Sequence, residues 1–287
     1  MSVSQRALRW LRAAGRRLTQ SPLVLFGTIV VTLFLLMAIF APFVAPYNYA
    51  TQFKDAIQQP PSLTHIMGTD NLGRDIFSRI VYGSRDVISL AGVGTIIAVI
   101  IGTTVGLAVT YRGGLVEELT MRLMDSMLAI PASLLALLLV GAVGISRESV
   151  ILVLVVVYIP IVARVVRSVV LDVKTKGFVE AAKVRGESTS YILFREILPS
   201  VLPALVVEGS LRFAYAIFLV STLGFLGVGV QPPSPDWGQL VFYARNYGVS
   251  APWMLFYPCA AIALLVVSIN LMADGLKQIF QASTVRE

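Results

Sequence analysis

Two opposite charges, Glu208 and Arg212, stand one helical turn apart within an apolar stretch. A charge inside a membrane costs about 2.5–3.5 kcal/mol on insertion scales, so we expect both side chains to face protein or water. The pair could line a translocation path and bind the charged termini of a zwitterionic solute. The nearby Pro199 favours another role, an ion pair that joins this span to a partner subunit. Asn270 and Asp125 are weaker candidates for a path and are expected to hydrogen-bond between helices.

A second group of polar residues interrupts the apolar segments in the middle of the chain. It comprises Glu180, Ala181, Ala182, Lys183, Arg185, Gly186 and Glu187, followed by Leu198 and Pro199. The sequence predicts a hairpin of two short helices, in which Glu180 and Lys183 share a solvated face and the two alanines let another backbone approach. Gly186 is expected to end the first helix, and Pro199 suits the first turn of the second. Such a hairpin is typical of a membrane protein that docks a soluble partner.

Composition defines the class of protein that must position these residues. Of the 287 residues, 56% are hydrophobic and 14% are charged, and the mean hydropathy is +0.80. Soluble domains carry about 25% charged residues, so the chain is predicted to be an integral membrane protein. With Cys259 and His65 as the lone cysteine and histidine, an internal disulfide, a two-histidine zinc site and a Ser-His-Asp triad are not expected. No lysine follows a glycine, which excludes the usual nucleotide-binding loop.

Six apolar stretches approach the ~20 residues that a helix needs to cross a membrane. They are Leu23–Val44, Val87–Tyr111, Leu119–Val140, Val150–Val170, Ala204–Leu226 and Leu255–Leu276. Each must be helical, because lipid offers no partner to backbone N–H and C=O groups. The predicted fold is an all-α integral membrane protein with six transmembrane helices and a cytoplasmic hairpin between the fourth and fifth. We divide it into an amphipathic segment, 1–22, and a transmembrane domain, 23–287, with the docking loop at about 171–200.

The distribution of basic residues predicts the topology. Of the 23 lysines and arginines, 16 fall on one side of the six spans and 6 on the other, and Arg212 lies within a span. By the positive-inside rule, both termini and the docking loop are cytoplasmic, and this rule explains the net charge of +7 without nucleic acid. The first span is longer than the 7–15 apolar residues of a signal peptide, so we expect an uncleaved anchor. Residues 1–22 are expected to lie on the inner membrane surface.

Other expectations concern the outer side and helix packing. Thr69 or Asp70 is expected to cap a short interfacial helix that precedes the second span, with Asp75 and Arg79 paired on it. An outer interfacial belt is predicted from aromatic residues, namely Trp237, Trp253 and Tyr257. Gly102 and Gly106 form a small-xxx-small step, which predicts a close contact between the second span and a neighbouring helix.

The docking loop resembles the coupling loop of ABC-importer permeases. That loop has Glu-Ala-Ala, three residues, Gly, nine residues, and four residues that end in Leu-Pro; here it runs from Glu180 through Gly186 to Pro199. Glu196 departs from the pattern, because the family usually has an apolar residue there. Further stretches resemble the dipeptide, oligopeptide and nickel group of these permeases: His65, Gly68-Thr69-Asp70, Gly73-Arg74-Asp75, Gly224-Phe225-Leu226-Gly227 and Gln231-Pro232-Pro233.

The resemblance implies a subunit of a binding-protein-dependent importer in the bacterial inner membrane. It implies a second permease subunit, usually a different one, two ATPase subunits and an extracytoplasmic substrate-binding protein as partners. ATP and magnesium would then bind to the ATPases, and this chain would hold no cofactor and perform no catalysis. The docking loop would transmit ATPase motion to the spans in an alternating-access cycle. Alternatives are a secondary transporter driven by an ion gradient, and a membrane scaffold whose hairpin docks a signalling partner.

Overall fold

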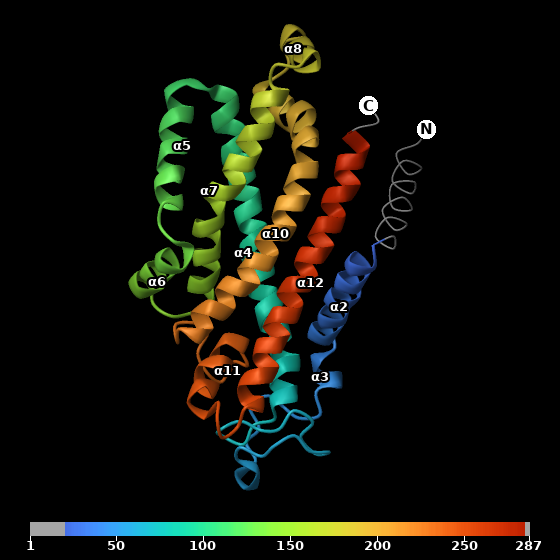
Figure 1. The fold of residues 1–287 in the computed structure, drawn as a ribbon. Coiled ribbons are helices and arrows are strands. Elements are labelled where there is room, and N and C mark those ends of the chain that lie inside the picture. The colour runs from blue at the N-terminus through green and yellow to red at the C-terminus, as the bar shows by residue number, and fades with distance from the viewer. Residues whose placement is uncertain (1–20, 285–287) are drawn as a thin grey trace.

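The computed structural model describes residues 21–284, with side chains up to residue 278, and its regular elements in that range are all helices (Figure 1). The helices are α2 (Pro22–Ile39), α3 (Ala41–Val44), α4 (Ile76–Arg112), α5 (Gly114–Leu128), α6 (Ala132–Val143), α7 (Arg147–Val173), α8 (Gly177–Val184), α9 (Thr189–Tyr191), α10 (Leu198–Phe225), α11 (Trp237–Ala244) and α12 (Trp253–Thr284). The predicted all-α class is confirmed. The amphipathic segment predicted at 1–22 lies almost wholly outside the described residues.

The predicted third span is not one continuous helix. Five helical stretches of the described chain are long and apolar enough to cross a membrane, and α5 and α6 form a sixth candidate that is bent by 93°. The bend follows from Pro131, which lacks an N–H to continue α5 and disfavours helical geometry at the residue before it. The prediction of six spans therefore holds when this bent pair counts as one.

The second span begins much earlier than predicted. α4 is a single helix of 37 residues, so the expected interfacial helix and the span are one element. Its cap is Asp75, whose side chain accepts a hydrogen bond from the backbone N–H of Ser78, and neither Thr69 nor Asp70 has this role. The first span ends early instead, because α2 stops at Ile39 and Pro42 opens the short α3.

The docking loop contains one short helix, not the predicted two. α8 is the first, but the second is the beginning of a helical stretch that runs without a break from Thr189 to Phe225. A π-helical turn, Ile192–Ile197, ends two residues before Pro199. Because Pro199 cannot donate a backbone hydrogen bond, this local widening lets the helix continue where the sequence predicted a break.

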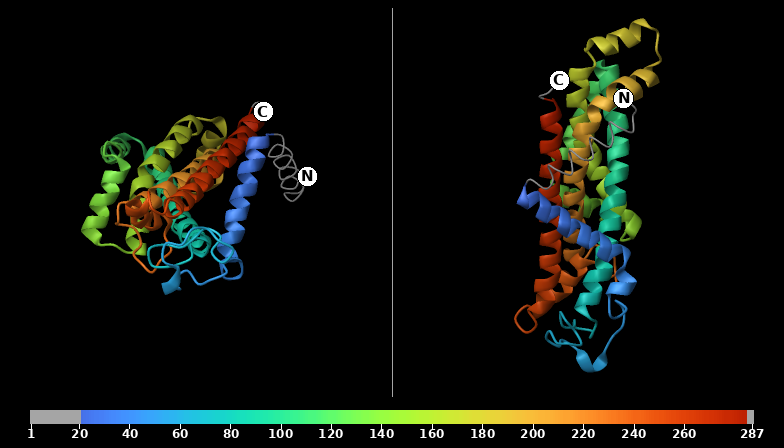
Figure 2. Two further views of the ribbon diagram at one scale, coloured as in Figure 1. Left: turned by 60° about the horizontal axis from the view of Figure 1, so that its bottom comes forward. Right: turned by 90° about the vertical axis from the view of Figure 1, so that its right-hand side faces the viewer.

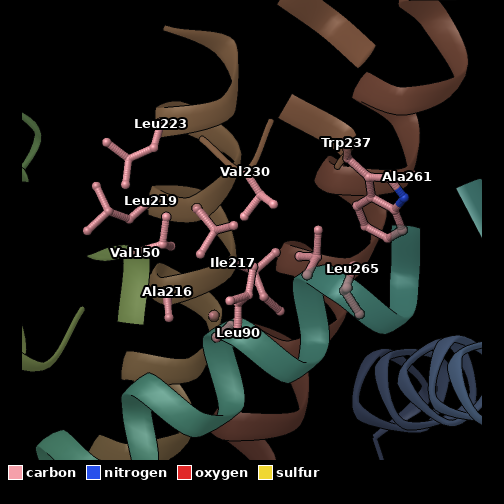
Figure 3. Close-up of a cluster of buried hydrophobic side chains, with 14 of the residues drawn as sticks. Leu90, Val150, Ala216, Ile217, Leu219, Leu223, Val230, Trp237, Ala261 and Leu265 are labelled. Atoms are coloured by element: carbon pink, nitrogen blue, oxygen red, sulfur yellow. The ribbon is translucent and has the colours of Figure 1, made fainter. Parts of the chain in front are cut away.

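The helices α4 and α7 form the centre of the bundle, and glycines set their distance. A Cβ at Gly102 would lie 2.8 Å from Val162 Cβ, and one at Gly106 would lie 2.8 Å from Val166 Cβ. The predicted close helix contact is confirmed. α10 and α12 complete the core, where side chains such as Leu90, Ile217 and Leu265 interlock (Figure 3).

The two ends of the bundle differ in structure. α8 and the last turns of α12 lie at one end, whereas α11 and the connection between α3 and α4 lie at the other (Figures 1 and 2). We call these the α8 end and the α11 end. The segments with polar and charged side chains gather at both.

Candidate functional site

The helix α8 ends in a glycine turn that fixes its exit direction. Gly186 has a φ of +75°, where residues with a Cβ are strained. The Glu187 N–H donates to Ala182 O at 3.1 Å and the Gly186 N–H donates to Lys183 O at 3.0 Å, which closes the helix with satisfied carbonyls. The predicted role of Gly186 as a helix terminator is confirmed. A Cβ at Gly186 would meet no atom of the described chain within 4 Å.

The inner face of α8 is anchored in the protein's own core. Val179 and Ala182 are fully buried and pack in one cluster with Ile192 and Ile197 of the π-helical turn. Only one of the two alanines can therefore meet a partner: Ala181 is exposed, and Ala182 is already covered. The expectation that both admit another backbone is wrong for Ala182. This anchoring couples α8 mechanically to the start of α10.

The outer face of this region is apolar as well as charged. Phe178 is 41% exposed, Val184 is 89% exposed and Phe194 is 53% exposed. Isolated bulky side chains on a surface need no explanation, but these three lie on α8 and the turn that packs against it, where Glu180 and Lys183 are also exposed. Apolar anchors ringed by charges are typical of protein-binding surfaces. The sequence analysis missed these three anchors because it considered only the polar residues of the loop.

The unusual residue of the loop, Glu196, has an electrostatic role. Its Oε1 lies 3.4 Å from Arg185 Nη2, and Arg185 also lies 3.6 Å from Glu187. The acid therefore ties the end of α8 to the helix that leads into α10. Leu198 is half-buried and Pro199 is exposed at the start of that helix. The geometry explains how the loop keeps its shape with a charged residue in this position.

Glu208 and Arg212 form an ion pair with each other on α10, and the predicted contact with a partner subunit stays a prediction. Arg212 Nε lies 2.8 Å from Glu208 Oε1, and both side chains are largely buried. The guanidinium also faces the rings of Tyr215, at 4.9 Å, and Tyr158 of α7, at 5.8 Å. Asn270 is not with them: its Nδ2 donates to Val266 O of its own helix, so the expected bond between helices is absent among the described residues. A pathway role for Glu208, Arg212 and Asn270 stays a prediction.

Ion pairs join α5 to α7 near the α8 end. Arg164 pairs with Asp125, which confirms the predicted interhelical bond of Asp125. Arg167 Nε lies 2.6 Å from Glu117 Oε1, and Lys174 donates to Thr110 O at 3.2 Å. These contacts therefore connect α5 and α4 to α7.

The α11 end contains a buried network of charges. Arg74 Nε lies 2.7 Å from Asp70 Oδ2, and His65 Nδ1 lies 2.9 Å from Asp75 Oδ1. The predicted pairing of Asp75 with Arg79 is wrong. The carboxylate of Asp75 caps α4 through Ser78 and also contacts His65. Arg79 lies 3.8 Å from Asp70 instead. The network fixes the α3–α4 connection on the bundle, a structural role.

The predicted aromatic belt is wrong for Trp237. Its side chain is fully buried, and its Nε1 donates to Ile80 O at 3.1 Å, because α11 folds back against α4 and α10. The preceding residue, Asp236, is also fully buried and caps α11 through the Gln239 N–H. Burial raises the pKa of Asp236 to about 7, nearby Asp86 adds to the effect, and Arg79 acts against it.

This raised pKa predicts that stability depends on pH through Asp236. The carboxyl binds its proton more tightly in the folded protein, so its contribution is complete below the ordinary pKa of 3.8 and is lost as the pH rises through about 7. Asp236→Asn keeps the capping oxygen and removes the charge. We expect the variant to unfold at a higher temperature than wild type at pH 8, with a difference that shrinks toward pH 5, in thermal melts of the detergent-solubilised protein. The exposed Asp55→Asn is the control, and equal pH profiles for wild type and Asp236→Asn would contradict this prediction.

Comparisons with known proteins bear on the whole arrangement of bundle and docking loop. The sequence pattern of the binding-protein-dependent transport system inner membrane component matches residues 94–286, which include α8 and the Glu208–Arg212 pair of α10. The chain belongs to this family. The pattern of the N-terminal transmembrane domain of oligopeptide transport permease C also matches, over residues 9–61.

Similar curated proteins cover almost the whole chain. A dipeptide transport system permease protein of Alkalihalophilus pseudofirmus is 39% identical over 93% of this chain and 88% of its own length. A di/tripeptide transport system permease protein of Pseudomonas aeruginosa is 37% identical over 88% of this chain and 85% of its own. A glutathione transport system permease protein of Pectobacterium atrosepticum is 36% identical over 93% and 89%.

The fold has a counterpart among solved structures. The methionine ABC transporter MetNI in an inward-facing conformation matches with a TM-score of 0.58 and 22% identity, over 72% of this chain and 97% of that chain. At this identity the likeness concerns the fold alone. It agrees with the all-helical bundle that the sequence predicted.

Proposed function

We propose that this chain is one permease subunit of an ATP-driven importer for peptides or related small solutes. Membership of the binding-protein-dependent family supports the transport role. The relatives named for dipeptide, di/tripeptide and glutathione transport support a peptide-like cargo. The observation that carries the proposal is α8, a short helix anchored on the start of α10 with its apolar and charged outer face unoccupied by the described chain.

In this proposal, the α8 end faces the cytoplasm and the α11 end faces outward. The excess of basic residues on the α8 side supports this orientation, in which the chain spans the bacterial inner membrane and both termini lie on its cytoplasmic side. Two ATPase subunits bind at the α8 end, a second permease subunit completes the pathway, and an extracytoplasmic binding protein delivers the solute. ATP and magnesium belong to the ATPases, because this chain lacks the glycine-lysine loop that would cradle phosphates.

The geometry of α8 supports a lever mechanism. A force on Phe178 or Val184 passes through Val179 and Ala182 into the cluster at the start of α10, because these contacts are fully buried. α10 is continuous from there through the membrane and carries Glu208 and Arg212. The ATPases must bind this surface differently in their two nucleotide states, since a ligand shifts an equilibrium only by its differential affinity.

The proposal is tested by isolating the tagged chain from its native membrane in mild detergent and identifying the co-purifying proteins by mass spectrometry. We expect a second permease and one or two ATPases with nucleotide-binding loops. Phe178→Ser should release the ATPases while retaining the second permease, and Phe43→Ser, at an exposed site near the opposite end, is the matched control. A chain that purifies without any ATPase, with uptake abolished by an ionophore and not by ATP depletion, would favour a secondary transporter.

A further inference from the structure

A pocket of about 420 Å³ with both polar and apolar walls opens at the α11 end, away from α8. Its walls come from four separate segments of the chain. These are the connection after α3, the first turns of α4, the start of α7 and the segment before α11, which contribute Tyr49, Tyr82, Arg85, Arg147, Gln231 and Pro233. Nothing in the transport role proposed above uses this pocket.

The floor of the pocket is fixed by a carboxylate with both oxygens engaged. Asp86 Oδ1 accepts from Arg147 Nη1 at 2.8 Å, and Asp86 Oδ2 accepts from Ser234 Oγ at 2.7 Å. These bonds join α4 to residues 61 and 148 positions away, so they clamp three walls of the pocket together. They also neutralise the negative charge of Asp86, because Arg147 is its ion-pair partner.

The neighbouring Arg85 is left with a free positive charge. It is exposed, lines the pocket, and has no ion pair with any acidic residue in the described part of the chain. With Arg147 and Asp86 paired, the pocket carries a net charge of +1. Tyr49 and Tyr82 stand beside it with ring centroids 5.1 Å apart. A guanidinium in a pocket that two tyrosines also line is suited to bind a carboxylate through charge-assisted hydrogen bonds.

We infer that the pocket around Arg85 receives an acidic side chain of the extracytoplasmic binding protein when that protein docks on the α11 end. This inference rests on the proposed function, and it assigns one partner contact within it. Arg85 precedes the apolar run of α4, which begins near Val87, so the pocket lies at the surface of the α11 end, the end on which the binding protein docks in the proposed function. Charge complementarity at such a surface steers association and fixes the register of docking.

The test uses the assembled importer in lipid nanodiscs and the substrate-loaded extracytoplasmic protein that stimulates ATP hydrolysis by the wild-type complex. Affinity for that protein is measured by titration at low and high salt. We expect Arg85→Glu to weaken the affinity about ten-fold or more, with most of the difference lost at high salt. Arg85→Lys should retain part of the affinity. The matched control is Lys54→Glu, which reverses an exposed charge at the same end outside the pocket and should leave the affinity unchanged.

A reciprocal experiment identifies the source of the carboxylate. Acid-to-lysine changes on the docking protein should include one that restores the affinity of the Arg85→Glu complex. Equal affinities for wild type and Arg85→Glu would overturn the inference and leave the proposed function intact. The inference would also be overturned if Arg85→Glu impaired the transport of free dipeptide but not of the C-terminally amidated dipeptide. The carboxylate that meets Arg85 would then belong to the solute. A wild-type complex that no extracytoplasmic protein binds or stimulates would overturn the proposed function itself.

Discussion

Replacing Gly186 with valine is expected to reduce ATP-driven uptake by about ten-fold or more while the chain still inserts and assembles in the membrane. Gly186 adopts a φ of +75°, and a β-branched residue in that region costs about 1–3 kcal/mol of backbone strain. The strain falls on the turn that closes α8, so the exposed face of α8 changes its direction relative to α10. Uptake by proteoliposomes and ATP hydrolysis stimulated by the binding protein measure the effect.

Asparagine at the same position separates strain from contact. Asparagine tolerates a positive φ far better than valine, and its Cβ would meet no atom of the described chain. If the turn geometry is what matters, Gly186→Asn retains most of the activity that Gly186→Val loses. Loss in both variants would show instead that an ATPase surface packs directly on this glycine. Normal uptake by a well-expressed Gly186→Val protein would contradict the lever mechanism.

Much of the fold could be predicted because membranes impose simple rules on sequence. Apolar run lengths located the starts of α7 and α12 to within a few residues, and small-residue spacing located the contact at Gly102 and Gly106. The bend at Pro131 was not predicted, because the apolar run Leu119–Val140 was taken as one continuous span. Whether a proline bends a helix by a small or a large angle depends on the side chains that pack on either side of it.

The remaining differences between the sequence predictions and the structure arise from burial by segments that are distant in the chain. Arg79 is fully buried in the structure. Judged from the sequence alone, an arginine at this position is typical of an exposed helix at the membrane surface. α4 can begin at Ile76 because Asp75 caps its first turn, and because Asp70 of the α3–α4 connection lies 3.8 Å from the buried Arg79. The interface rule was wrong for Trp237 for the same reason, because α11, which begins with this residue, packs against α4 and α10. Each case needed a contact between residues distant in sequence.

The candidate site shows the same division. A short motif was enough to locate α8 and its terminating glycine, because local backbone geometry demands specific residues. The motif could not show which face of α8 is buried and which is exposed. Ala182 points inward and Ala181 outward because the π-helical turn Ile192–Ile197 packs on one side of α8 only. The pocket at Arg85 gave no sequence signal, since its four walls come from separate segments.

Replacing Gly106 with alanine is expected to destabilise the protein strongly, although alanine is the better helix former. The new Cβ would lie 2.8 Å from Val166 Cβ and 2.9 Å from the backbone oxygen of Ala163, so α4 and α7 must separate. Overpacking of this kind costs about 1–3 kcal/mol, which exceeds the helix gain of about 0.5–1 kcal/mol. A lowered thermal midpoint in detergent and a reduced yield of folded protein would show it, and Gly102→Ala should act in the same direction.

Gly92 supplies the matched control on the same helix. A Cβ there would meet only Phe213 Cε2, at 3.8 Å, which is ordinary contact. Gly92→Ala should therefore leave the thermal midpoint unchanged or raise it, because the helix preference acts without a clash. Equal effects of the two substitutions would show that backbone entropy, and not the α4–α7 distance, decides the stability of this helix. A neutral Gly106→Ala would show that the two central helices can part without loss, which would contradict the close contact on which the bundle is built.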